Sequence, residues 1–221
     1  MAQVMHQYYE AGLNRNRGVI NLKSDTIKLA LVTSGYIPNL NLHHVWNVTT
    51  TWQAATAYVA GDRVVPTTPD GYHYLCATGG TSGGTEPSPW NMAQGNSTTD
   101  NEVTWTTIID VGFHEVIDGD GYTTGGATLA NKTLTRSTWK TTFDADNVTF
   151  TALTKTFRYG VLYVSGTKTN PDGGPDIVNP LYAYVLFDDT PADIVVSGTD
   201  YVVQWSSLGI SHFGPVAEMS A

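Results

Sequence analysis

The sequence predicts an all-β protein, an antiparallel β-sandwich domain that is interrupted by a small β-rich module. Short strand-like runs recur at intervals of roughly 8–12 residues with Gly, Asp and Asn turns between them, as in sandwiches and barrels. Helical periodicity is absent almost everywhere. The stretch from Trp52 to Trp105 contains its own series of strand and turn patterns. We therefore predict four parts: an N-terminal arm (1–18), a discontinuous β-sandwich (19–49 and 107–212), an inserted module (50–106) and a C-terminal tail (213–221).

Composition limits the classes of function. Hydrophobic residues make up 41% of the chain, which is enough for a core, but only 14% of residues are charged, against about 25% in an average domain. The surface must therefore be built from Thr, Ser, Asn and Gly, as in proteins that pack into assemblies or in an ordinary Thr-rich sandwich. The net charge is −9 and the basic residues are scattered, whereas binding a nucleic-acid backbone needs clustered cations. We expect no nucleic-acid partner.

The single cysteine, Cys76, excludes an intrachain disulfide, and its alternating context YHYLCAT predicts a buried thiol. No segment approaches the roughly 18 apolar residues needed to cross a membrane. The first residues, MAQVMHQYYEAGL, lack the charged and apolar regions of a signal peptide. We expect a protein that is made in the cytoplasm, does not contact membranes and leaves the cell, if at all, by lysis.

The N-terminal segment is polar and contains Tyr8, Tyr9, Arg15 and Arg17. It has no long apolar helical face, so it predicts an arm or a short helix. An arm with paired tyrosines could dock on a neighbouring subunit, and the alternative is a loosely attached terminus.

Several strands and turns of the flanking halves follow from pattern. The stretch TIKLALV predicts a strand with Ile27, Leu29 and Leu31 on one well-buried face. The DGDG run at 118–121 predicts a hairpin turn, and the nearly continuous apolar run NPLYAYVLFDD predicts a central strand. The DGG and NP signals at 172–180 predict a long surface loop, where contacts tend to be made.

Three further expectations concern the last strands. The run DNVTFTAL places Val148, Phe150 and Ala152 on one face, and a second hairpin is predicted at 197–200. The run TFRYGVLYVS predicts one strand whose buried face carries four residues, Phe157, Tyr159, Val161 and Tyr163.

The module has its own elements. A small unit has little core, so most of its tryptophans and tyrosines must be used in packing. Its predicted elements, in order, are a turn at 61–62, a strand at 63–65, a turn at 69–71, a strand at 72–77, a glycine loop at 79–90 and a last strand at 102–108.

The strings AYVAGDRVVP, YHYLCATGGTSGGTEPSPW and DNEVTW resemble a short β module of phage tail and fibre proteins, which in turn is similar to chitin- and cellulose-binding modules. The resemblance covers about 55 residues, and the chain departs from the pattern between Trp90 and Thr99. It implies a carbohydrate-binding-like module in which Trp52, Tyr72 and Trp90, with His73, form an aromatic platform for a host glycan. The alternative places Trp90 and Trp105 in the core, with Tyr72 capping a hairpin.

The flanking halves also resemble known proteins. INLKSDTIKLALVTSGY, GYTTGGATLANKTLT, FDADNVTFTALTKTFRYGVLY and NPLYAYVLFD are similar to small β proteins of tailed-bacteriophage virions. This resemblance implies a virion structural protein, expected to be a capsid decoration or cement protein. We expect a homotrimer that contacts the major capsid protein or neighbouring virion proteins. The expected contacts are the arm, with Tyr8, Tyr9, Arg15 and Arg17, and the loop at 170–179. The alternative is a tail fibre, tail-tip or adaptor protein whose module binds host glycan.

Candidate chemistry is sparse. The acids of DGDG and DADN are expected in turns rather than around calcium, because a helical calcium loop needs a terminal Glu. His43, His44 and His114 flank the module and could meet around a metal ion, although adjacent residues on a strand point to opposite faces. Hydrolysis would need two carboxylates, such as Glu86 and Glu115, paired as acid and base, but no pattern in the sequence places two carboxylates together. Glu86 is expected to accept hydrogen bonds from turn amides. Nucleophile and phosphate-loop motifs are absent from the sequence. We therefore expect no enzyme, no cofactor and no metal.

Overall fold

The computed structural model describes residues 4–137, 140–188 and 192–213. The all-β prediction is confirmed, because these residues form several antiparallel sheets with one short α-helix and one 3₁₀ turn. The tail predicted at 213–221 lies outside the described residues except for Phe213. No helix within the described ranges is both long enough and apolar enough to cross a bilayer.

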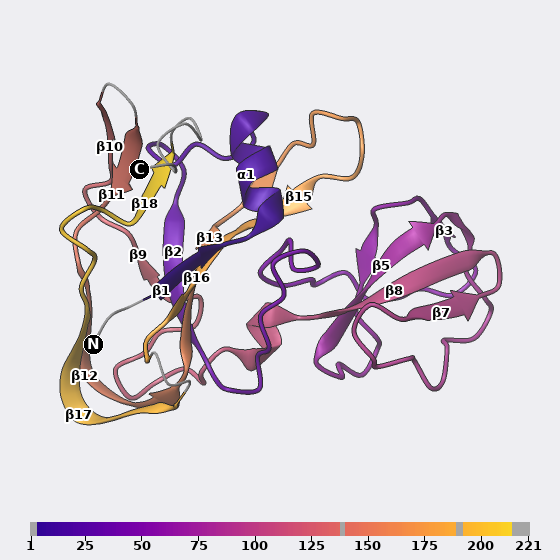
Figure 1. The fold of residues 1–221 in the computed structure, drawn as a ribbon. Coiled ribbons are helices and arrows are strands. Elements are labelled where there is room, and N and C mark those ends of the chain that lie inside the picture. The colour runs from indigo at the N-terminus through magenta and orange to yellow at the C-terminus, as the bar shows by residue number, and fades with distance from the viewer. Residues whose placement is uncertain (1–3, 138–139, 189–191, 214–221) are drawn as a thin grey trace.

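Most strands belong to one compact unit, which we call the body: the described residues outside 49–109 (Figure 1). Its main layer is a five-stranded antiparallel sheet. In spatial order the sheet contains β1 (Val4–Gln7), β16 (Leu181–Leu186), β13 (Tyr159–Val164), β2 (Ile27–Val32) and β9 (Ala127–Thr128). The apolar run around residue 183 is therefore a central strand, as its sequence predicts.

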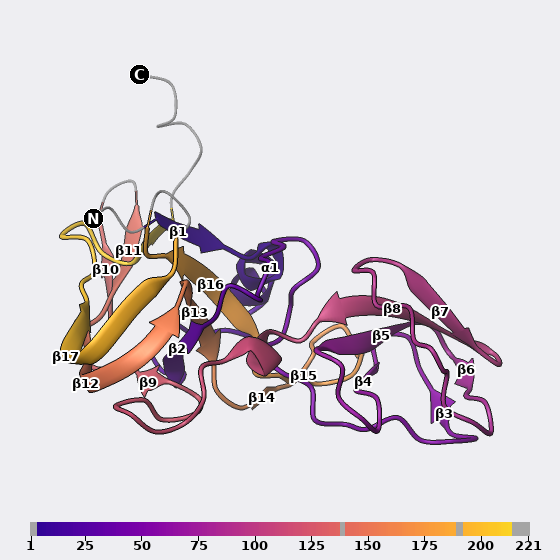
Figure 2. The ribbon, with the colours of Figure 1, turned by 90° about the horizontal axis from the view of Figure 1, so that it is seen from below.

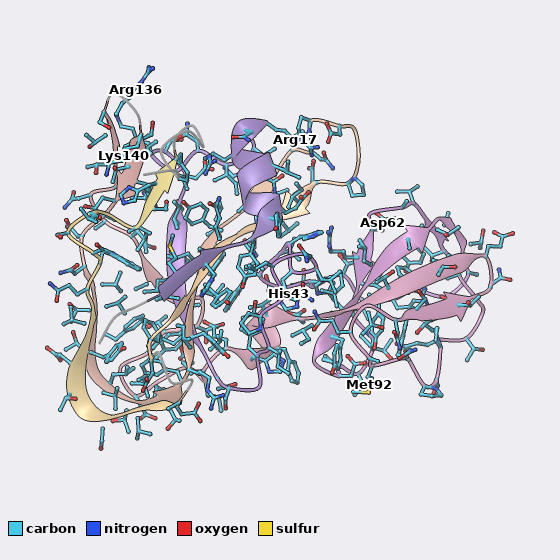
Figure 3. All side chains as sticks on the ribbon, viewed as in Figure 1. Arg17, His43, Asp62, Met92, Arg136 and Lys140 are labelled. Atoms are coloured by element: carbon cyan, nitrogen blue, oxygen red, sulfur yellow. The ribbon has the colours of Figure 1, made fainter. Side chains whose placement is uncertain are left out.

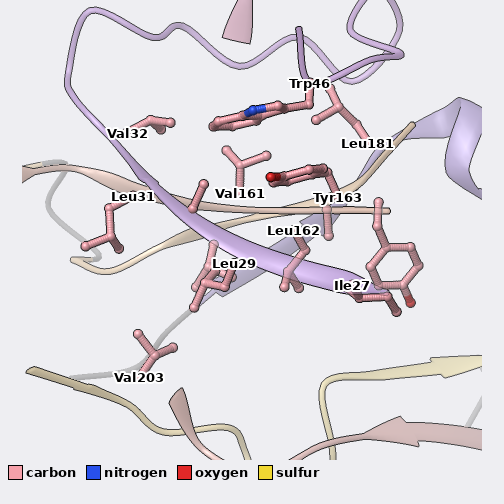
Figure 4. Close-up of a cluster of buried hydrophobic side chains, with 14 of the residues drawn as sticks. Ile27, Leu29, Leu31, Val32, Trp46, Val161, Leu162, Tyr163, Leu181 and Val203 are labelled. Atoms are coloured by element: carbon pink, nitrogen blue, oxygen red, sulfur yellow. The ribbon is translucent and has the colours of Figure 1, made fainter. Parts of the chain in front are cut away.

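A second layer faces this sheet and closes the core. It consists of a long two-stranded ribbon, β12 (Val148–Phe157) with β17 (Ile194–Val203), and a three-stranded sheet, β10 (Thr133–Arg136), β11 (Thr141–Asp144) and β18 (Ser211–Phe213). Side chains of both layers form one core cluster. Figure 4 shows Leu29 of β2 facing Val203 of β17 across it. Strand β2 is buried on both faces, because Ala30 and Val32 are as inaccessible as Leu29, so the prediction of a single buried face was too narrow.

The N-terminal segment is part of the body. Strand β1 pairs with β16, and helix α1 (Tyr9–Asn16) follows it directly. Tyr8 lies in the core with 1% of its surface exposed. The short helix of the sequence prediction is therefore present, and the segment from residue 4 is attached by a strand ladder rather than extended as an arm.

The ribbon corrects three sequence predictions. No hairpin forms at 197–200, because β17 continues through it and Gly198 adopts a positive φ of 66° there. Opposite it, Ala152 has a φ of 50°, and the register shifts between Phe150 and Leu153. This β-bulge turns Ala152 outward and puts Leu153 into the core. The strand predicted across residue 158 is also broken, so Phe157 ends β12 and Tyr159 begins β13.

Residues 49–109 form a separate sheet, which we call the module (Figures 1 and 2). In both views it extends from the side of the body opposite the β12–β17 ribbon. Its strands are β4 (Arg63–Val64), β5 (Tyr72–Thr78), β8 (Val103–Ile109) and β7 (Ser97–Asp100), with a second pair, β3 (Ala57–Tyr58) and β6 (Gly80–Thr81). The predicted strands at 63–65, 72–77 and 102–108 are present. Strand β7 was missed because it lies where the chain departs from the module's pattern.

The two chain segments that join module and body lie side by side. The N–H of Gly112, in the 3₁₀ turn η1 (Val111–His114), donates to the carbonyl of Trp46 at 2.7 Å. The Trp46 ring stacks on Tyr163 of β13, with ring centroids 4.8 Å apart and an interplanar angle of 6°, as Figure 4 shows. The point of insertion is thus fixed to the main sheet by an aromatic pair.

Candidate functional site

The three residues predicted to bind glycan lie in or against the core of the module. Trp52 and Trp90 are 5% and 8% exposed and belong to one buried cluster, against which the half-buried Tyr72 packs. Trp90 stacks on Tyr74 with centroids 4.1 Å apart and meets Trp105 edge to face. The structure therefore brings these rings together as packing, and the two tryptophans do not present open faces on which a sugar could stack.

Carboxylates hold these indoles in place. Asp100, at the end of β7, accepts hydrogen bonds from Nε1 of Trp52 at 2.8 Å and Nε1 of Trp105 at 3.1 Å. Its other oxygen accepts the N–H of Gly83, in the glycine loop, at 2.8 Å. Glu86 accepts the N–H of Thr67 at 2.9 Å, which confirms its predicted bond to a turn amide. The sequence analysis did not predict that Asp100 binds the two indoles. Its only signal in the sequence is its position before Asn101, which the structure places in a turn with a φ of 56°.

The four predicted partner-contact residues are dispersed. The hydroxyl of Tyr8 hydrogen-bonds to the hydroxyl of Tyr36 inside the body, whereas Tyr9 is 66% exposed on helix α1. The guanidinium of Arg15 lies 3.6 Å from the centre of the Phe213 ring. Arg17 forms a salt bridge of 2.7 Å with Asp172 in the loop between β14 (Thr167–Lys168) and β15 (Ile177–Val178), and Figure 3 shows it on that side of the body. Of the four, Tyr9 and Arg17 are the most available to a partner.

A buried polar network occupies the junction between module and body. His43 is fully buried, and its Nδ1 lies 2.9 Å from the Tyr36 hydroxyl. Its Nε2 lies 3.0 Å from the side-chain amide of Gln94, in the module, and Figure 3 shows His43 between the two parts. Burial lowers the pKa of His43 to about 4, so the ring is neutral at pH 7. Burial also lowers the pKa values of His44, His73 and His114.

The histidines do not form a metal centre. Within the described residues, no group of three His, Cys, Asp or Glu side chains could hold a metal ion. The Nε2 of His44 contacts the carbonyl of Asn41 at 2.9 Å, and His114 packs against Gly35. Each ring thus has its own local contacts.

The acidic residues proposed for chemistry are also separated. Glu115 accepts hydrogen bonds from the Tyr122 hydroxyl at 2.6 Å and the Gly125 N–H at 2.5 Å, far from the bonds that Glu86 makes in the module. Burial raises the pKa of Glu115. Asp118 accepts the Thr124 N–H, as expected of a turn residue, whereas Asp144, also expected in a turn, ends strand β11 and accepts the Ala145 N–H. These contacts give each carboxylate a structural role.

The outer face of the ribbon carries few charged side chains. Along two ten-residue strands, the exposed side chains are small, polar but uncharged, or β-branched, apart from Asp200. Charged side chains on the ribbon are engaged: Lys155 with Asp120, and Asp200 with the N–H of Ala152. The face consists of Thr149, Thr151, Thr154, Thr156, Val195, Ser197, Thr199 and Val202. We call these residues the ribbon face.

Comparisons with known proteins supply no relative. No family model matches this chain, and neither a curated protein nor a solved structure matches it significantly.

Proposed function

We propose that the chain is a structural protein of a bacteriophage virion, a capsid decoration protein that stabilises the head through repeated contacts with neighbouring subunits. The observation that carries this proposal is the ribbon face. The central parts of protein interfaces are depleted of charged residues. Along the two strands Asp200 is the one charged residue classed as exposed, and it accepts the Ala152 N–H. The resemblance of the flanking strings to virion β proteins supports the same function.

The ribbon also has features of an assembly edge. Neither β12 nor β17 pairs with a third strand among the described residues. Long edge strands normally carry charges that prevent pairing with other chains, and the only charged side chain of β17, Asp200, is bonded back to β12. We therefore place the contact with the next subunit on the ribbon and expect a homotrimer, in which small contacts are multiplied on the particle.

The module extends away from this contact surface. The ribbon lies at one end of the body and the module at the other (Figures 1 and 2). A subunit bound to the shell through its ribbon would therefore carry the module outward. In the alternative, the chain belongs to the tail and the module binds host glycan, but the buried faces of Trp52 and Trp90 give that role no aromatic platform.

Copy number distinguishes the two locations. Purified virions would be analysed by quantitative mass spectrometry with the major capsid protein as internal standard. A decoration protein is expected in hundreds of copies per particle, and a tail protein in about a dozen or fewer, as multivalent display on a shell requires. Absence of the chain from purified virions would contradict both versions of the proposal.

A further inference from the structure

A cleft of about 310 Å³ lies between the module and the body. Its walls come from three segments: the chain that leads into the module (45–50), the module strands around Tyr58 and Arg63, and the β14–β15 loop with Pro175 and Asp176. The volume is at the lower end of the range for small-molecule sites, about 300–1,000 Å³. From this cleft we infer a binding site for a neutral saccharide of one or two rings, independent of the assembly role.

The cleft is held open between fixed walls. Asn179 Nδ2, at the base of the β14–β15 loop, donates to Asn47 Oδ1 at 2.9 Å, and the Trp46 N–H donates to the Asn179 carbonyl at 2.8 Å. At another point the loop touches the module, where a Cβ on Gly61 would lie 3.1 Å from Pro175 Cδ. A site with such preformed walls loses little conformational freedom when it binds a ligand.

The polar groups of the cleft include carboxylate acceptors with unused capacity. Asp176 is exposed and makes no hydrogen bond or salt bridge to any described residue. Asp62 uses one oxygen to accept the Val59 N–H at 2.8 Å. The buried Nε of Arg63 has no partner among the described residues. This N–H is covered by the protein, so the charged groups open to a ligand are the carboxylates of Asp62 and Asp176.

The mixture of groups selects the chemistry of the ligand. Sugar hydroxyls both donate and accept, so they can bond carboxylates and the amide of Asn47 within one small site. The carboxylates of Asp62 and Asp176 disfavour an anionic ligand. Accessible apolar surface is supplied by Val48, Pro175 and Val178, of which Val178 is 44% exposed, and the C–H face of a sugar can pack against it.

The test uses the full chain and a defined panel of neutral sugars: glucose, galactose, mannose, N-acetylglucosamine, cellobiose, lactose and chitobiose. Saturation-transfer NMR would identify binding, and calorimetry would give the affinity. We expect at least one sugar to bind with a Kd of about 0.1–10 mM, as a small open site allows. No binding by any sugar of the panel at about 20 mM would overturn the inference.

Variants locate the site. Thr49 is exposed, lines the cleft and makes no side-chain hydrogen bond to the residues that the structure describes, so T49W should fill the cleft and weaken binding at least about tenfold. D176N should weaken it about three- to tenfold through loss of a charged acceptor. The control T85W puts the same ring at an exposed module position outside the cleft and should bind within about twofold of the unchanged chain. Equal affinities of T49W and T85W would place the sugar elsewhere. If T49W does not fold, D176N, on an exposed loop, decides alone.

Discussion

The side-chain amide of Gln94 lies 3.0 Å from Nε2 of His43, although 51 residues separate them along the chain. His43 belongs to the body and is fully buried, and its other ring nitrogen accepts the Asn39 N–H at 3.3 Å. A loop of the module is thus bound to a side chain inside the body. Together with the contact of Arg63 with His44 at 3.4 Å, this bond fixes how the module is oriented.

The buried histidine predicts that stability decreases in acid. The pKa of His43 is about 4 in the folded chain and about 6.5 in an unfolded one. The unfolded state therefore binds more protons between these values, and the free energy of unfolding decreases as pH falls from 6.5 to 4, by about 3 kcal/mol for this group. Urea unfolding at several pH values would measure the slope.

The variant H43Q should reduce that slope without abolishing it, because His44, His73 and His114 also have lowered pKa values. The matched control is H212Q, since His212 is exposed on β18. An unchanged slope in H43Q would show that His43 does not contribute to the acid response.

Asp100 should be the most sensitive polar position of the module. In D100N an amide nitrogen replaces one of two oxygens that together accept three N–H groups, so at least one buried donor loses its partner. We expect a loss of about 2 kcal/mol in the free energy of unfolding, followed by tryptophan fluorescence in guanidinium chloride. E102Q, two residues further on, keeps an oxygen for the exposed Thr81 N–H and should stay within about 0.5 kcal/mol. A D100N protein as stable as E102Q would contradict the assignment.

Two glycines of the 118–121 turn provide a matched pair. Both have positive φ, 93° at Gly119 and 82° at Gly121. A Cβ at Gly119 meets nothing within 4 Å, whereas one at Gly121 would lie 2.5 Å from the Thr151 carbonyl oxygen. G119A should therefore destabilise by about 1 kcal/mol through backbone strain alone, and G121A by about 3 kcal/mol. Thermal denaturation would compare the two variants. Equal losses of stability would mean that Gly121 is not in close contact with the backbone of β12.

The ribbon face should control self-association. Val195 is 73% exposed and Val202 is also exposed, so lysine at both positions adds charge to the face without disturbing the core. We expect V195K/V202K to lose the trimer in light scattering coupled to size-exclusion chromatography, with the unfolding free energy of the subunit changed by less than about 1 kcal/mol. The control I117K alters a residue that is 82% exposed outside the ribbon and should remain trimeric. Association of the double variant equal to that of I117K would remove the ribbon from the interface.

The sequence predicted much of the fold because strand patterns are local. Alternation at 27–32 and 72–77 and the Gly-rich turn at 118–121 each depend on a few neighbouring residues. The failures required non-local information. Whether Ser-Gly-Thr-Asp at 197–200 forms a hairpin or a bulge depends on its partner Ala152, which lies 45 or more residues away. The junction cleft joins segments near 47, 62 and 176, and no pattern within any one of them indicates that they meet.

The chain passes between body and module at two adjacent places, Trp46 and Gly112, and this affects how such a chain can change. The two ends of the module leave the body at a single point, closed by one backbone hydrogen bond and by the Trp46–Tyr163 stack. A short connector could replace residues 49–109 without stretching any strand of the main sheet. The body could therefore carry a different small domain in place of the module. Such a domain needs adjacent termini, and the sheets of the body would be preserved.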